Sequence, residues 1–140
     1  MADRDGAVPQ GAGSQPLLSY VITHVGSAAI VVVTGELDLH TVRELAAVAE
    51  QAASGSAVEL VVLDLTAVGF VGSSGFGGLI VLRRRLAEVG AALRLVAGDN
   101  RAVLRPWTVM ALQDAFPLFP DLPSALAHSG RIREHPAGPA

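Results

Sequence analysis

Cysteine and lysine are both absent from this chain of 140 residues. Without cysteine there can be no disulfide bond and no thiol chemistry, which suits a reducing compartment, so we expect a cytoplasmic protein. All ten basic residues are arginines. A phosphate-binding P-loop needs a lysine directly after its second glycine. Gly72 and Gly77 have the required separation, but Gly78 occupies the lysine position, so a P-loop is excluded.

Long apolar runs and excess positive charge are also missing. Hydrophobic residues make up 51% of the chain. Polar or turn-forming residues nevertheless interrupt every apolar stretch well before the roughly 18 residues that a membrane span requires. The formal net charge is −3, which provides no electrostatic footprint for nucleic acid. We therefore expect neither a membrane nor a nucleic acid as a partner.

The length predicts one domain, over residues 17–128. Residues 1–16 are rich in Gly, Ala, Gln and Asp and lack the apolar core of a secretion signal, so we expect a flexible tail there. The composition of residues 129–140 is similar, so we expect a second flexible tail there.

Alternating strand and helix patterns predict an α/β fold. A turn at Gly26 joins the first two strands into a hairpin, and His40 or Thr41 is positioned to cap the first helix, which ends near Ser54 and Gly55. The expected strands are 17–23, 29–34, one beginning at Leu60, 93–97 and a short one near Phe116, and the later helices are one that starts around Ser74, 101–110 and 123–128. Helical crossovers between strands require a parallel or mixed sheet. We expect four to five strands with about four helices packed against them.

The segment from Leu60 to Leu86 is the most informative part of the chain. An apolar strand leads through Gly72, Ser73, Ser74 and Gly75 into a helix. The expected inner stripe of this helix is Leu79, Leu82, Leu86 and Val89, and Gly90 is expected to end it. Unpaired N–H groups and the helix dipole favour an anion at a helix start. The two serines can therefore be structural caps or phosphate acceptors, with Ser73 as the first candidate and Ser74 as the alternative.

Enzymatic chemistry lacks support in the same segment. A nucleophile elbow has the pattern Gly-x-Ser-x-Gly, but Phe76 occupies the last glycine position. No histidine has a spacing that converges on Ser74; the four are His24, His40, His128 and His135. Glu36 and Asp38 lack the third ligand that a metal site needs, and Asp38 is equally suited to capping a helix. We expect no catalysis, no metal and no cofactor.

The motifs resemble the STAS domain of bacterial anti-sigma factor antagonists. The resemblance rests on Gly35-Glu36-Leu37-Asp38 followed by Thr41, on Asp64-Leu65-Thr66 with Val68 and Phe70, and on Ser73-Ser74-Gly75-Phe76-Gly77. These motifs occur in the same order and with similar separations, and the similarity extends over about residues 17 to 128. It implies a STAS-like fold.

The resemblance also implies a function. In that family a kinase-type anti-sigma factor phosphorylates the serine corresponding to Ser73, and phosphorylation ends binding. The counterpart of Asp38 lies near the phosphorylated loop and touches the partner. The implied partner-binding residues are Glu36, Asp38, Thr41, Gly72, Ser73, Ser74, Gly75 and Phe76. A PP2C-type phosphatase is an expected second partner, ATP belongs to the kinase, and the protein itself is expected to be a monomer or weak dimer.

One residue departs from the family pattern. The residue before the phosphoserine is usually aspartate, whereas this chain has Gly72. The substitution removes a capping carboxylate, which Ser73 is positioned to replace. It also keeps an alternative open: a STAS-like binding module of a transport or signalling assembly whose serines are never phosphorylated. A serine hydrolase is a second alternative, and reaction with a fluorophosphonate would reveal it.

Overall fold

The computed structural model describes residues 17–54 and 57–127. The tails expected at 1–16 and 129–140 lie outside these described residues, as do Gly55, His128 and His135. Within the described ranges, none of the helices combines the length and the apolar character needed to cross a membrane.

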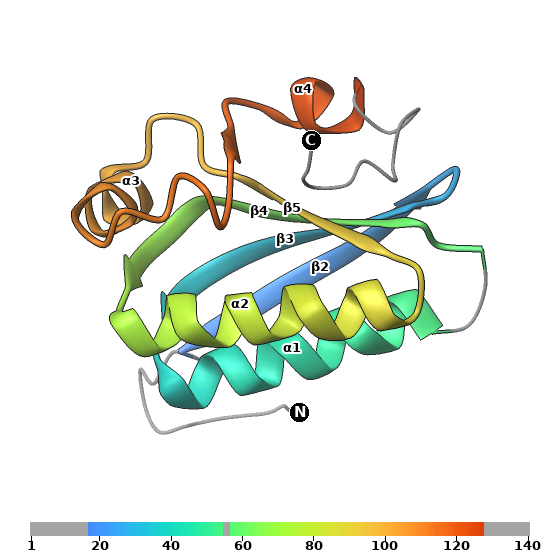
Figure 1. The fold of residues 1–140 in the computed structure, drawn as a ribbon, viewed down its shortest axis with the longest axis horizontal. Helices are drawn as coiled ribbons and strands as arrows, with labels where there is room; N and C mark the ends of the chain where they lie inside the picture. The colour runs from blue at the N-terminus through green and yellow to red at the C-terminus, as the bar shows by residue number, and fades with distance from the viewer. Residues whose placement is uncertain (1–16, 55–56, 128–140) are drawn as a thin grey trace, which may run out of the picture.

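Five strands form one mixed sheet, and four helices pack around it (Figure 1). In chain order the elements are β2 (Leu18–Val25), β3 (Ala28–Leu37), α1 (Leu39–Ser54), β4 (Leu60–Val71), α2 (Ser73–Glu88), β5 (Ala92–Val96), α3 (Arg101–Val109), β6 (Leu118–Phe119) and α4 (Leu122–Ala127). The sheet order is β2-β3-β4-β5-β6, with β2 antiparallel to β3 and all later pairs parallel. The predicted fold class and the initial hairpin are confirmed.

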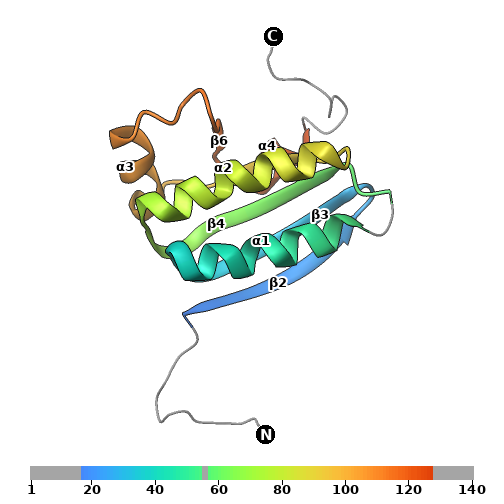
Figure 2. The same ribbon diagram turned by 60° about the horizontal axis from the view of Figure 1, so that its bottom comes forward.

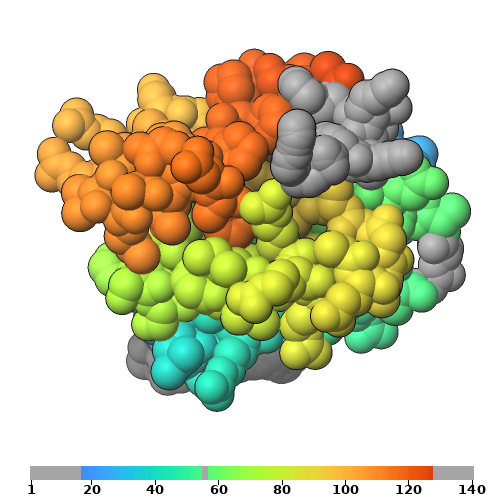
Figure 3. Space-filling model, viewed as in Figure 1, coloured from blue at the N-terminus to red at the C-terminus, as the bar shows by residue number. Residues whose placement is uncertain are grey.

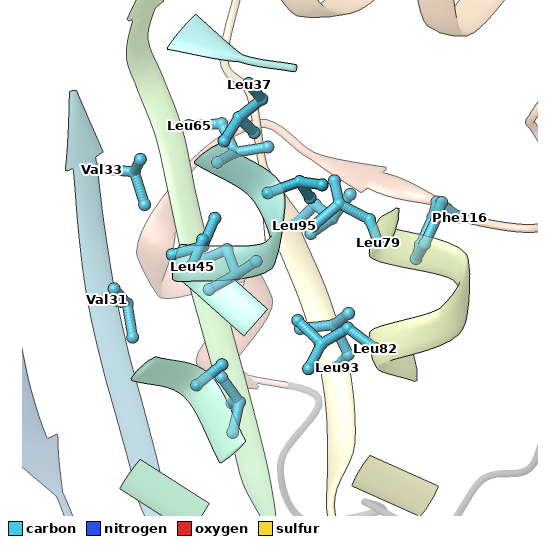
Figure 4. Close-up of a cluster of buried hydrophobic side chains, with 14 of the residues drawn as sticks. Val31, Val33, Leu37, Leu45, Leu65, Leu79, Leu82, Leu93, Leu95 and Phe116 are labelled. Atoms are coloured by element: carbon cyan, nitrogen blue, oxygen red, sulfur yellow. The ribbon is translucent and has the colours of Figure 1, made fainter. Parts of the chain in front are cut away.

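The sheet separates two apolar clusters. Helices α1 and α2 lie side by side on one face, whereas α4 covers part of the other (Figures 1 and 2). The larger cluster fills the space beneath α1 and α2, and ten of its side chains are labelled in Figure 4: Val31, Val33, Leu37, Leu45, Leu65, Leu79, Leu82, Leu93, Leu95 and Phe116. The smaller cluster lies under α4 and includes Ile30, Val62 and Val96. Strand residues alternate between the two faces, as the period of two requires.

The expected inner stripe of α2 is correct except at its end. Leu79, Leu82 and Leu86 are fully buried, but Val89 is 64% exposed. Val89 is the C-cap residue, where the chain has already left helical geometry. Gly90 ends the helix as predicted, with a φ of +84°. The N–H of Ala91 donates to the Leu86 carbonyl at 2.9 Å, which is the bond of a Schellman motif.

The short strand predicted near Phe116 is present and begins two residues after it. β6 is formed by Leu118 and Phe119, whereas Phe116 lies before it with its ring in the main core. The Phe116 carbonyl accepts a hydrogen bond from Trp107 Nε1 at 2.7 Å. A buried aromatic residue in a loop gives the same local sequence signal as a strand, which explains the offset of two residues. Trp107 packs against the core, in agreement with its apolar character.

Candidate functional site

The candidate site lies at the edge of the sheet where β3 and β4 end. These strands are parallel, and Leu37 is paired with Val71 at their carboxyl ends. α1 begins two residues after Leu37, and α2 begins two residues after Val71. Two helix N-termini therefore lie at one edge, with the motif residues of both turns between strand and helix (Figure 1).

Asp38 caps α1. Its Oδ1 accepts hydrogen bonds from the backbone N–H groups of His40 at 3.0 Å and Thr41 at 2.9 Å. Thr41 Oγ1 accepts in return from the Asp38 N–H at 3.0 Å. This reciprocal arrangement is that of a capping box. The expectation that His40 or Thr41 caps this helix is wrong, because both already lie within the helix and only Asp38 precedes it.

These bonds set the charge state of Asp38. The hydrogen bond from the Thr41 backbone N–H is the main cause that lowers the pKa of this carboxyl, and further bonds from Thr41 and His40 act in the same direction. Each of these donors stabilises the ionised form. Asp38 therefore carries a full negative charge at neutral pH. The same interactions hold it at the edge of the sheet.

The start of α2 has no comparable cap. Its N-cap is Gly72, and within the described residues no side chain accepts from the first-turn N–H groups. The expectation that Ser73 replaces the missing carboxylate as a cap is therefore wrong, because Ser73 is already the first helical residue. Ser73 and Ser74 are both exposed, and neither hydroxyl makes a hydrogen bond to any described residue. Both hydroxyls are accessible from solvent.

Glycine at position 75 allows α2 to approach β3. The Gly72 N–H donates to the Leu37 carbonyl at 3.0 Å. A Cβ added at Gly75 would lie only 2.5 Å from that same carbonyl oxygen. At Gly78 an added Cβ would lie 2.5 Å from Val42 Cγ1 on α1. Since Leu37 directly precedes Asp38, this close packing joins the two turns into one surface.

The residues predicted for partner binding fall into two groups. Glu36, Ser73 and Ser74 are exposed, and Asp38 and Gly72 are partly so. The other three are buried: Thr41, Gly75 and Phe76. Thr41 Oγ1 also donates to the Glu36 carbonyl at 2.6 Å, so its hydroxyl is engaged inside the turn. These three residues therefore support the exposed residues of the two turns and are too buried for direct contact with a partner.

Two exposed apolar side chains flank this surface and were not predicted. Leu39 is 55% exposed and Phe70 is 49% exposed. The ring of Phe70 lies beside Gly72, only 3.3 Å from the position that a Cβ there would take. Exposure of an aromatic residue next to a turn cannot be read from an apolar sequence pattern, because the same pattern describes a buried strand residue.

Asn100 is a supporting residue that the sequence reasoning also missed. Its Oδ1 accepts from the Ala102 N–H at 3.0 Å and thereby caps α3. Its Nδ2 donates to the carbonyls of Leu65 at 2.9 Å and Val68 at 2.8 Å. The position of an asparagine just before a helical pattern was the available signal for the cap. Its bonds to β4 had no signal in the local sequence.

Three consecutive arginines of α2, at positions 83–85, point in three different directions. Arg83 donates to the Ala115 carbonyl, and Arg85 forms an ion pair with Glu50 of α1 at 3.0 Å. Figure 3 shows the contact region, where the yellow-green surface of α2 adjoins the orange segment after α3. Arg84 is exposed. Two of the three arginines therefore bind other parts of the chain.

No group of three or more potential metal ligands occurs among residues 17–54 and 57–127.

Comparisons with known proteins agree on one family. The family model described as the STAS domain matches residues 19–125. No match was found among curated protein sequences. Three similar solved structures share the fold. An anti-sigma factor antagonist from Mycobacterium paratuberculosis has 25% identity and a TM-score of 0.62, over 84% of this chain and 95% of that one.

The other two are more distant in sequence. The anti-sigma factor antagonist SpoIIAA, in its unphosphorylated form, has 19% identity and a TM-score of 0.62, over 84% of this chain and 100% of that one. The murine anion transporter Slc26a9 has 19% identity and a TM-score of 0.62, over 77% of this chain and 18% of that one. At these identities the two structures establish the shared fold.

Proposed function

Because the chain belongs to the STAS domain family, we propose that it is an anti-sigma factor antagonist that binds a kinase-type anti-sigma factor and so releases a sigma factor. Phosphorylation of Ser73 by that kinase ends the interaction, and a PP2C-type phosphatase restores it. The similarity to the mycobacterial antagonist supports the general role. The observation that carries the switch is the exposed Ser73 hydroxyl at the uncapped start of α2.

The start of α2 suits a phosphate for two physical reasons. Its first-turn N–H groups have no side-chain acceptor among the described residues, so a phosphate oxygen can accept from them. The positive end of the helix dipole also favours the added negative charge. The modified side chain is therefore accommodated by the protein that carries it, without unfolding of the helix.

The same phosphate is expected to weaken the binding of a partner protein. A phosphoserine adds about 1.5 to 2 negative charges at a surface that already carries ionised Asp38. A partner surface complementary to neutral Ser73 would have to desolvate that charge, which costs on the order of a few kcal/mol. A single modification is thus sufficient to change the stability of the complex by orders of magnitude.

The proposed contact surface consists of the accessible members of the predicted set: Glu36, Asp38, Gly72, Ser73 and Ser74. Thr41 holds Asp38 in place, and Gly75 and Phe76 hold α2 against β3 and the core. Substitutions at these three residues are expected to act through the geometry of the two turns.

The alternative function is a binding module that is never phosphorylated. Gly72 supports it, because the carboxylate usual in the family is replaced by a residue with no side chain. STAS-like domains also occur in larger proteins, as the match to 18% of the murine transporter illustrates. In this alternative the exposed serines only form part of a docking surface.

The test measures intact mass after incubation with ATP and each kinase-type anti-sigma factor from the same organism. We expect one added phosphate, retained in Ser74→Ala and lost in Ser73→Ala. Gly72→Asp should be phosphorylated faster, because it restores the usual carboxylate and the Phe70 ring needs to move by only a few tenths of an ångström. Binding without phosphate transfer by any kinase, including to Gly72→Asp, would favour the unswitched module.

A fluorophosphonate probe serves as the control for catalysis. We expect no labelling of the protein, since the proposal gives the serines no nucleophilic role. Labelling that is lost in Ser73→Ala or Ser74→Ala would support a hydrolase instead.

A further inference from the structure

β2 is the outermost described strand of the sheet, and it lacks the features that usually protect a sheet edge. Figure 2 shows it beyond β3, on the side away from β4. Edge strands are normally protected by charged residues, proline or short length. β2 has eight residues, contains no proline and no Asp, Glu, Lys or Arg, and is exposed at every position after Leu18. Such an edge is suited to pairing with another strand.

The outward-facing backbone groups follow from the pairing with β3. The Glu36 N–H donates to the Leu17 carbonyl at 2.9 Å, and the register continues unbroken from Leu18 opposite Gly35 to Val25 opposite Ala28. Hydrogen-bonded and non-bonded pairs alternate in an antiparallel ladder. Odd-numbered residues therefore bond to β3. The N–H and C=O groups of the even-numbered residues 18, 20, 22 and 24 are directed away from it.

Both faces of β2 carry apolar side chains, together with Ser19 and Thr23 on one face and His24 on the other. Tyr20 and Ile22 are opposite Val33 and Val31, whose side chains lie in the core beneath the helices. Even so, Tyr20 is 41% exposed and Ile22 is 38% exposed. On the other face Val21 is 64% exposed, opposite Val32 at 37%. The strand thus presents exposed apolar side chains on both faces of the sheet and outward-directed backbone N–H and C=O groups along its edge.

We propose that β2 pairs with β2 of a second copy of this chain, antiparallel about a two-fold axis at Val21. This register joins the outward-facing even-numbered residues of the two copies, as an antiparallel ladder requires. It places Tyr20 opposite the partner's Ile22 and Ile22 opposite the partner's Tyr20, on the helix-bearing face. Aromatic residues opposite β-branched residues are favourable cross-strand pairs. Val21 meets its own copy on the other face.

A second copy is the occupant that the strand itself favours. The pairing is self-complementary, so the same Tyr20–Ile22 pair forms twice, and an isologous interface covers the β2 edge of both copies. The strand has no formal charge with neutral His24, so no like charges meet across the axis. The interface does not involve Ser73, so the proposal is independent of the proposed phosphorylation.

A single introduced cysteine tests this register, because the chain has no cysteine of its own. Val21→Cys places two thiols across the axis in a non-hydrogen-bonded pair, where Cα atoms are about 4.5 Å apart and within disulfide range. We expect rapid conversion to a covalent dimer under mild oxidation. Val25→Cys is the matched control on the same strand and face, and its two thiols would be about 26 Å apart in this register. Val109→Cys, on α3, controls for random collision.

Sedimentation of the unmodified full-length chain over a range of concentrations provides the second measurement. We expect a reversible monomer–dimer equilibrium, with Val21→Lys raising the dissociation constant at least about tenfold because two ammonium groups would meet at the axis. A monomer at every concentration overturns the proposal. So does cross-linking of Val21→Cys no faster than that of the two control variants, or a dimer that is unaffected by Val21→Lys.

Discussion

Three glycines at the start of α2 have different structural roles. Gly75 and Gly78 lie where a Cβ would meet Leu37 and Val42, whereas an added Cβ at Gly77 would have no neighbour within 4 Å. Glycine lowers the stability of a helix interior relative to alanine. At Gly75 and Gly78 the close contact with another element offsets this loss of stability, whereas at Gly77 no contact does. The position of Ser73 therefore depends on a close backbone contact two residues later.

This difference gives opposite predictions for two alanine substitutions. Gly75→Ala should lower the free energy of unfolding by about 1–3 kcal/mol, because the Leu37 carbonyl cannot move without disturbing β3. Gly77→Ala should raise it by about 0.5–1 kcal/mol through helix propensity alone. Urea unfolding of both variants measures the two effects. Equal stabilisation by both substitutions would show that α2 does not require the close approach to Leu37.

The lowered pKa of Asp38 leads to a prediction about how the stability of the protein depends on pH. Its pKa is lowered in the folded protein, mainly by the Thr41 backbone N–H. Its stabilising effect is therefore complete above the pKa of the unfolded chain, which is about 3.9, and is lost as the pH falls through the lower folded-state pKa. Asp38→Asn keeps a capping oxygen that does not titrate. We expect the stability of this variant to fall less steeply in acid.

The measurement is the urea midpoint of both proteins from neutral pH to about pH 2, below the range of ordinary carboxyl pKa values. Asp121 also has a lowered pKa, mainly through Ser124, and it is unchanged in the variant. The difference between the two curves therefore isolates Asp38. Parallel curves would contradict the assigned role of this carboxylate.

At the scale of elements, β4 extends beyond the strand beside it. Its last residue paired with β5 is Asp64, opposite Val96, so the carboxyl-terminal part of β4 has no strand neighbour on that side within the described residues. Asn100 supplies the missing donors there by bonding to the carbonyls of Leu65 and Val68. The end of β4, and hence the turn that carries Ser73, is held by the residue that caps α3.

Asn100→Asp separates the two roles of this side chain. Aspartate caps a helix as well as asparagine does, but it has no N–H groups to donate to β4. The two carbonyls would face a carboxylate, so we expect a loss of about 1–3 kcal/mol in the free energy of unfolding. Chemical denaturation measures this loss, with Asn100→Ala as the variant that lacks both roles. An unchanged stability for Asn100→Asp would mean that capping alone explains the residue.

At the scale of the whole molecule, the two faces of the sheet are covered unequally. α1 and α2 cover one face along its length, whereas on the other α4 is the only described helix packed against the strands (Figure 1). Arg94 of β5 lies beneath α4 and is only 7% exposed. Its Nη1 donates to the Ala125 carbonyl at 2.9 Å, and its guanidinium lies 5.9 Å from the ring centroid of Phe119. A buried cation thus connects the covering helix to the sheet.

Arg94→Met should loosen α4 more than the rest of the fold. Loss of a hydrogen bond from a charged donor costs about 1.5–3 kcal/mol, and α4 is too short to remain ordered without its contacts. We expect faster amide hydrogen exchange in Leu122–Ala127 and little change in α2. Arg101→Met, at an exposed position of α3, is the control. Uniformly faster exchange across the sheet would indicate that Arg94 supports the global fold.

The sequence by itself determined the order and type of the elements and the location of the serine turn. Periodic apolar residues and turn-forming glycines are local signals, so they predicted the hairpin, the mixed sheet and the end of α2 at Gly90. The spacing of the motifs around Asp38 and Ser73 similarly indicated the family. These features depend on residues that are close together in the chain.

Only the tertiary structure decided which side chains are accessible and which residues position the turns. Thr41 and Phe76 are buried and Phe70 is exposed because of how elements distant in sequence pack together. The contact of Gly75 with Leu37 and the bonds from Asn100 to β4 have the same origin. Burial and close approach are properties of pairs of elements, so no local pattern along a single segment can specify them.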